Sequence, residues 1–397
     1  MSQSLPANDR LVQVDALRGF ALFGILVVNI GVFASPFFGP GVESPLFSRP
    51  QDQATEWVIA WLFQTKFYLL FSFLFGYSFT LQMAAAERSQ AAFRPRFLRR
   101  LAGLAILGLA HAVLFYQGDI LLTYALLGLL LLRFRNVDPR TALKTALWLI
   151  ALSAAFWGLT GLTSLLGPVP PDYAAEYLAN AQAAIEAYRG SIGTTIAQHI
   201  KELTESVWLV ILLVQGPSAF AMFLVGYALG RRNALAQPGS HPRTLWLLVA
   251  IGLVPGLAGS AVYATSLLPS AGPAWELPSL ALDLLTAPLL SMSYAAALLL
   301  SLRTRAGACL GAWLAPAGRM ALTNYLMQSV VCAFVFTGWG LGLFGRLPPL
   351  ATFGIAVAVY LVQLPMSAWW LRGHAYGPVE WVLRALTIGG WPAWRRP

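Results

Sequence analysis

Charged side chains are scarce in this sequence, and their scarcity excludes most soluble folds. They make up 11% of the 397 residues, whereas a soluble globular protein carries about 25%. Hydrophobic residues make up 58%, the mean hydropathy is +0.66, and long apolar runs recur along nearly the whole chain. We therefore predict an all-α, polytopic membrane helix bundle with no large soluble domain.

Cysteine and histidine are also rare, with two and four residues in the chain. Cys309 and Cys332 lie in separate apolar segments, which is typical of small packing residues and not of a disulfide framework or a metal site. The sequence has no P-loop, HExxH or GxSxG motif. Hydrolase, nucleotidase and metalloenzyme functions therefore have no support, and we expect no metal cofactor.

Windows of about 20 apolar residues predict about ten transmembrane helices. Their approximate limits are 15–35, 57–84, 98–116, 120–134, 143–167, 206–230, 244–268, 279–302, 318–344 and 350–371. We divide the chain into an N-terminal membrane half, residues 1–135, and a C-terminal membrane half, residues 136–397. After residue 372 the Trp residues and arginines of the tail predict a helix that lies along the inner membrane surface.

The net charge of +10 comes from short basic loops between the apolar runs. These loops lack the interleaved aromatic residues that single-stranded nucleic acids stack on, so we expect no nucleic-acid partner. With the N-terminus in the cytosol, 19 Lys and Arg residues fall on inner segments and 5 on outer segments. Because basic loops stay in the cytosol, this bias predicts that both termini are cytosolic.

The first apolar run, DALRGFALFGILVVNI, keeps polar residues at both ends. Asp15 and Arg18 are three residues apart and can pair on a helix. Arg18 and Asn29 are eleven residues apart, so they lie on one helix face about 16 Å apart along the axis. Such a stripe avoids lipid. It serves either as an anchor with a packing Asn or as the lining of a functional cavity.

Two further segments carry titratable groups. Lys66 begins the run KFYLLFSFLFGYS and either extends to the outer membrane surface or acts in a site. Arg100 and His111 share a face of the run RRLAGLAILGLAHAVL, and the turn that follows contains Asp119. We expect Asp119 to reach His111 or Lys66. Histidine suits proton transfer near neutral pH, although a lone buried His often only joins two helices.

The segment GRMALTNYLMQSV places four hydrogen-bonding side chains in one apolar run, namely Arg319, Thr323, Asn324 and Gln328. Pairs four residues apart share a helix face. These side chains either hold the bundle together or line a cavity. Asp283, near the outer end of the eighth predicted span, is a further candidate.

Together these blocks resemble the YeiB-like family of bacterial inner-membrane proteins. The blocks are DALRGFALFGILVVNI, KFYLLFSFLFG, the His111 segment with GDILLTYAL, and GRMALTNYLMQS. The resemblance covers essentially the whole chain. It implies that a domain of unknown function occupies roughly residues 220–390, and it implies a bacterial inner-membrane location.

The family is similar, more distantly, to the transmembrane acyltransferase superfamily. That similarity implies a cytosolic acyl-CoA donor and an acceptor in the envelope, either a glycan or a small molecule. Arg18 matches the superfamily's arginine, but Asn29 occupies the position of the histidine in many members, and residues 36–66 contain no histidine. We therefore assign the role of the base to His111.

The leading hypothesis is an acyltransferase in which His111 is the general base and Asp119 orients it. Asn29 or Lys66 would stabilise the oxyanion. The donor-binding residues would be Arg18, Arg100, Arg319, Asn324 and Gln328. The alternatives are a transporter or exporter of a solute or lipid-linked molecule, and a structural membrane protein. Membrane lipids are the expected partners, and a homo-oligomer is compatible with the sequence.

Overall fold

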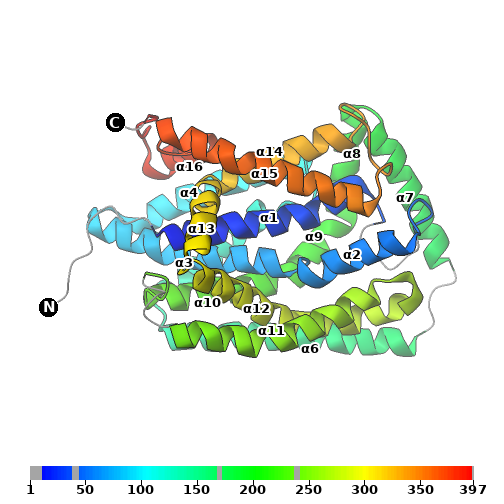
Figure 1. The fold of residues 1–397 in the computed structure, drawn as a ribbon, viewed down its shortest axis with the longest axis horizontal. Coiled ribbons are helices and arrows are strands. Elements are labelled where there is room, and N and C mark those ends of the chain that lie inside the picture. Colours follow the sequence, from blue (N-terminus) through cyan, green and yellow to red (C-terminus); the bar gives the residue numbers. More distant parts are fainter. Residues whose placement is uncertain (1–10, 38–43, 168–171, 237–241, 396–397) are drawn as a thin grey trace.

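The computed structural model describes residues 11–37, 44–167, 172–236 and 242–395. Arg10 and Arg396, which belong to the charge count above, lie outside this range. Long helices run side by side along the bundle, as Figure 1 shows. The helices are α1 (Val12–Ala34), α2 (Pro50–Leu62), α3 (Lys66–Arg88), α4 (Phe93–Leu114), α5 (Leu121–Arg133), α6 (Pro139–Leu166), α7 (Tyr173–Arg189), α8 (Ile192–Glu202), α9 (Trp208–Val210), α10 (Gly216–Arg231), α11 (Pro242–Ser266), α12 (Glu276–Ser301), α13 (Arg305–Arg319), α14 (Ala321–Phe336), α15 (Pro349–Gly373) and α16 (Pro378–Ile388).

The predicted fold class, an all-α polytopic bundle, is confirmed. Within the described ranges, 8 helical segments are long and apolar enough to cross a membrane, and α5 and α14 are shorter apolar helices. Several of the long helices present large apolar side chains outward, such as Trp148 and Leu159 on α6 and Val254 on α11. Such surfaces are suited to contact with lipid tails.

Two predicted spans are interrupted. The span predicted over 57–84 divides into α2 and α3, and Thr65 between them has a φ of 71°. The span predicted over 318–344 begins with the break between α13 and α14 and ends as a helix at Phe336. Gly342 and Gly345 then adopt positive φ in the turns before α15, a conformation that glycine adopts without strain. In Figure 1 α13 lies across the bundle and not along it.

One hydrophobic core joins both halves of the chain. Helix α3 packs closely on α10 because each supplies a glycine at the contact. A Cβ on Gly76 would lie 2.0 Å from the carbonyl oxygen of Phe223, and one on Gly226 would lie 2.0 Å from that of Phe73. Small residues allow membrane helices to approach at backbone distance.

The two ends of the bundle differ. At one end, which we call the α16 end, lie α16, the start of α1 and the α3–α4 turn, and at the other, the α8 end, lie α7 and α8 (Figure 1). The α7–α8 hairpin is fastened to the bundle, because Tyr188 O accepts a hydrogen bond from Gly338 N at 2.7 Å. Arg189 Nε also donates to the carbonyl oxygen of Phe344 at 2.7 Å.

Candidate functional site

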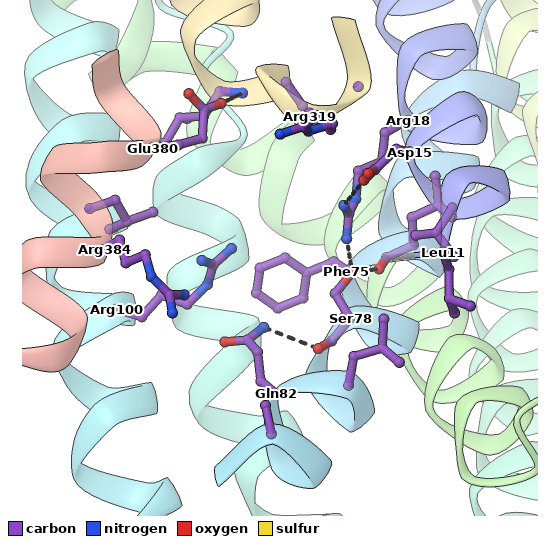
Figure 2. Close-up of a pocket in the computed structure, with 18 of the residues that line it drawn as sticks. Leu11, Asp15, Arg18, Phe75, Ser78, Gln82, Arg100, Arg319, Glu380 and Arg384 are labelled. Carbon is purple, nitrogen blue, oxygen red and sulfur yellow. Dashed lines mark hydrogen bonds and ion pairs between the residues drawn. The ribbon is translucent and has the colours of Figure 1, made fainter. Parts of the chain in front are cut away.

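A cavity of about 1560 Å³ opens at the α16 end, between α1, α3, α4, α13, α14 and α16. Figure 2 shows Arg18, Arg100, Arg319 and Arg384 around one common space. We call this space the arginine cavity. Its lining includes the arginines Arg18, Arg88, Arg96, Arg100, Arg232, Arg319 and Arg384, and the acidic residues Asp15 and Glu380.

The two carboxylates of the cavity are both engaged. Asp15 accepts a hydrogen bond from Arg18 at 2.8 Å, which confirms the predicted pair, and Arg18 also donates to Ser78 Oγ at 2.5 Å. Glu380 caps the start of α14 by accepting from Leu322 N at 2.7 Å and from Thr323 N at 3.1 Å. A carboxylate is favourable at a helix N-terminus.

The remaining charge of the cavity is positive. Arg100 is repelled by Arg18 and Arg384, and Glu380 is the attracting carboxylate. Such a cluster of guanidinium groups attracts an anion, and phosphate is the anion that arginine binds bidentately. The cavity therefore has the electrostatics of a site for a phosphorylated ligand.

The inner part of the cavity is apolar and aromatic. Leu104, Ile120, Leu121, Tyr124 and Tyr325 line it. Tyr325 also packs on His111, with ring centroids 5.1 Å apart. Tyr325 thus stands between the arginine cavity and the predicted base.

His111 and Asp119 form a buried pair. His111 Nδ1 lies 2.8 Å from Asp119 Oδ1, and the other carboxylate oxygen accepts from Leu122 N at 2.9 Å. The carboxylate accepts from Nδ1–H, and in the neutral imidazole Nε2 then holds a lone pair. Nε2 of His111 has no hydrogen-bond partner among the described residues. A fixed imidazole with one available nitrogen is the arrangement of a general base.

One face of α1 connects the cavity with the surroundings of His111. Arg18, Leu22 and Ile25 line the cavity. Asn29 and Phe33 continue this face by one turn each, and Phe33 stacks on Tyr116, with ring centroids 4.6 Å apart. Tyr116 lies beside His111, at 6.1 Å between ring centroids. The half-buried Asn29 makes no side-chain hydrogen bond within the described ranges.

His199 on α8 is a member of this region that the sequence analysis missed. It is 2% exposed, its Nδ1 lies 3.0 Å from the carbonyl oxygen of Val113, and it interacts electrostatically with His111. Burial lowers the pKa of His199, the bond to Val113 opposes this, and His111 lowers the pKa further. The sequence carried only the spacing, since Thr195 and His199 are four residues apart and share a helix face. That this face is buried is visible in the structure alone.

Lys66 lies in a separate site and does not extend to the membrane surface as one sequence interpretation had it. Its side chain is fully buried, with Nζ 3.4 Å from Asp283 and 3.2 Å from the carbonyl oxygen of Ala60. Asp283 also accepts hydrogen bonds from Thr65 at 2.7 Å and from Ser260 at 2.8 Å. Of the two partners proposed for Asp119, His111 is the one it contacts.

Asn324 and Gln328 face α15. Asn324 donates to Ser367 Oγ at 2.9 Å, and Gln328 donates to Gln363 Oε1 at 2.8 Å. Neither lines the arginine cavity. The structure thus brings Arg18, Arg100 and Arg319 together, and it adds Arg384 and Tyr325, which the sequence analysis had not assigned to a site.

The chain is similar to several bacterial proteins over nearly its whole length. It is 35% identical to "Uncharacterized protein YxaH" of Bacillus subtilis (strain 168) over 399 residues, covering 97% of this chain and 96% of that protein. It is 30% identical to "Uncharacterized protein YeiB" of Escherichia coli (strain K12) over 401 residues, covering 96% and 97%.

A third relative is the "Uncharacterized 39.9 kDa protein in amylase 3'region" of Bacillus acidopullulyticus, which is 30% identical over 382 residues, covering 96% of this chain and 94% of that protein. No solved structure matches the chain. The family profile described as "Protein of unknown function (DUF418)" matches residues 229–390. The predicted family is confirmed, and the chain belongs to the YeiB-like membrane proteins that share this region.

Proposed function

We propose that the protein is a membrane acyltransferase that takes an acyl group from cytosolic acyl-CoA. One observation carries this proposal: a cavity lined by seven arginines at its α16 end continues inward to Tyr325, which packs on the buried His111–Asp119 pair. An acyl-CoA has the matching chemistry, with phosphates at one end and a long, less polar arm that carries the thioester at the other.

The arginines would bind the phosphates, and the arm would extend along the α1 face from Arg18 towards Asn29. His111 Nε2 would remove the proton of an acceptor hydroxyl or amine as that group attacks the thioester carbonyl. The C–S bond breaks, a C–O or C–N bond forms, and the thiolate leaves and takes up the proton. Asn29 suits oxyanion stabilisation better than Lys66, because Lys66 is engaged with Asp283.

The orientation is part of the proposal. We place the α16 end in the cytosol and the α8 end at the outer face of a bacterial inner membrane, from the bias of basic residues towards the α16 end. The acceptor would then be a small molecule or glycan of the envelope. We also propose a division of the chain at residues 135/136 and a homo-oligomeric state.

Donor binding tests this function directly. Purified protein should be stabilised thermally by acetyl-CoA or a longer acyl-CoA. Arg18→Ala should weaken binding by about ten- to 150-fold, because one charge-assisted contact contributes about 1.5–3 kcal/mol. Arg303→Ala, at an exposed position outside the cavity lining, is the matched control and should bind normally. No stabilisation by any acyl-CoA at millimolar concentration would contradict the proposal.

A transporter is the second candidate, and the Lys66–Asp283 pair favours it. Buried ion pairs beside interrupted helices occur in solute and proton pathways, and Lys66 follows the break at Thr65. If this candidate is right, Lys66→Met cells would show the same phenotype as cells that lack the protein. The wild-type protein would also show no stabilisation by acyl-CoA.

A further inference from the structure

The α8 side of His111 contains a second imidazole that the proposed reaction does not use. His199 Nδ1 lies 3.0 Å from the carbonyl oxygen of Val113, two residues after His111 on α4. A carbonyl oxygen only accepts, so Nδ1 of His199 carries the proton and Nε2 holds a lone pair. No described residue donates a hydrogen bond to this Nε2.

The neighbouring groups hold His199 in place. The ring of Tyr188 packs on it at 5.4 Å between centroids, and the hydroxyl of Tyr188 donates to Glu202 at 2.9 Å. Thr195, one turn before His199, is 1% exposed, and its hydroxyl oxygen has no partner among the described residues. Three buried polar side chains, from α4 and α8, therefore have an atom with remaining hydrogen-bonding capacity.

The chemistry of these atoms selects the ligand. In their neutral forms His111 and His199 both present an Nε2 lone pair. That of His111 is fully buried without a partner among the described residues, and a buried acceptor without a donor is costly. The oxygen atoms of an ionised phosphate or carboxylate carry lone pairs and no proton, so they cannot donate a hydrogen bond to either Nε2. An ammonium group would need a counter-charge, but Asp119 is bonded to His111, and Glu202 accepts from Tyr188 and Gln198. Neutral hydroxyl groups satisfy both nitrogens without a buried charge.

We propose that His111 and His199 together bind the acceptor, a polyhydroxy compound with two neighbouring hydroxyl groups. One hydroxyl donates to His111 Nε2 and is the attacking group in the acyl transfer. The other donates to His199 Nε2 and stays intact, so His199 selects and orients the acceptor. The transfer step rests on the proposed function, whereas the binding of the diol does not.

Nitrogen NMR of the histidine side chains tests the binding without any acyl-CoA. Protein labelled with ¹⁵N in its imidazoles is titrated in lipid nanodiscs with methyl glucoside, and with 2-propanol and ethylamine as single-hydroxyl and amine controls. Single His→Gln variants assign the signals. Methyl glucoside should move the Nε2 signals of His111 and His199 upfield together, and the His374 signal should stay in place. A shift confined to His111, equal shifts with 2-propanol, a shift with ethylamine alone, or no shift would each overturn the inference.

Kinetics give the second test once a donor is found. His199→Gln should raise the KM for the polyhydroxy acceptor at least tenfold and change kcat little, and His199→Asn should recover part of the loss. If His199 only stabilises α8, the melting temperature would fall while the acceptor KM stays unchanged. Paired NMR shifts without any acyl transfer would disprove the acyltransferase and leave the diol site standing. Acyl transfer with an unchanged acceptor KM in His199→Gln would disprove the diol site and leave the acyltransferase standing.

Discussion

At the scale of single residues, the His111–Asp119 pair is the feature on which the proposed chemistry depends. His111→Gln keeps the size of the side chain and a hydrogen-bonding group but removes the basic nitrogen. We predict that turnover falls by about 10²–10⁴-fold, while expression and melting temperature stay close to those of the wild type. Asp119→Asn should lower turnover less, because the base remains but loses the carboxylate that orients it.

The control for this prediction is His111→Leu, which removes all polar contacts. If the imidazole only joins helices, His111→Leu would lower the melting temperature and His111→Gln would leave activity nearly unchanged. An active His111→Gln protein would therefore contradict the assignment of His111 as the general base. Turnover and melting temperature of both variants, measured in the same detergent, decide between the two roles.

Several of these residues could be predicted because their partners are near in sequence. Asp15 and Arg18 are one helical turn apart, and Asp119 follows His111 across a single tight turn. The burial of Lys66 could not be predicted, because Asp283 lies on a distant helix and only the fold brings the two together. His199 was missed because its segment reads as part of an outer loop, and its burial against α4 is a tertiary property.

At the scale of elements, the contact between α3 and α10 should be sensitive to a single methyl group. A Cβ on Gly76 would lie 2.0 Å from Phe223 O, which is backbone and cannot move aside. We predict that Gly76→Ala destabilises the protein by about 1–3 kcal/mol, measured as a lower thermal midpoint. Gly354 on α15 has no atom within 4 Å of such a Cβ, so Gly354→Ala should be neutral or slightly stabilising. Equal midpoints for the two variants would contradict this packing.

The docking of α8 should depend on pH through His199. Burial lowers the pKa of this imidazole below its usual 6.5, so the folded protein keeps it neutral where the unfolded chain takes up a proton. The unfolded state then binds more protons, and stability falls as pH decreases from about 6.5 towards the lowered pKa. His111 interacts with the group electrostatically, Tyr188 packs on it, and Glu202 is bonded to Tyr188, so we isolate its effect by comparison with His199→Gln. The thermal midpoint of the wild type should fall more steeply than that of His199→Gln between pH 7 and pH 5, and parallel curves would contradict the prediction.

The existence of most helices followed from apolar length, but their interruptions did not. The α2–α3 break at Thr65 has no Gly or Pro, and its one mark in the sequence is the polar run Gln64–Thr65–Lys66, which a window of about 20 apolar residues averages out. The break between α13 and α14 is stabilised by Glu380 from α16, far along the chain. Both breaks depend on long-range contacts, which periodicity does not record.

At the scale of the whole molecule, the two sequence halves share one core. Helix α3 packs on α10 and α1 packs on α13, so contacts cross the division at residues 135/136. The arginine cavity likewise combines α1, α3 and α4 with α13, α14 and α16. The site is therefore a product of the complete bundle, and the charge bias of its loops is the observation on which the proposed orientation in the membrane rests.

This assignment predicts the outcome of cysteine labelling. Cys309 and Cys332 are replaced by Ala, and single cysteines are placed at Asn180 on α7 and at Ala92 in the α3–α4 turn, both at exposed positions. Transfer of a loop with several arginines across the membrane is unfavourable, and Arg88, Arg94 and Arg96 flank Ala92. We therefore expect a membrane-impermeant maleimide to label position 180 in intact spheroplasts and position 92 only after permeabilisation. If position 92 labels first, the arginine cavity faces outward, cytosolic acyl-CoA cannot reach it, and the proposed donor is wrong.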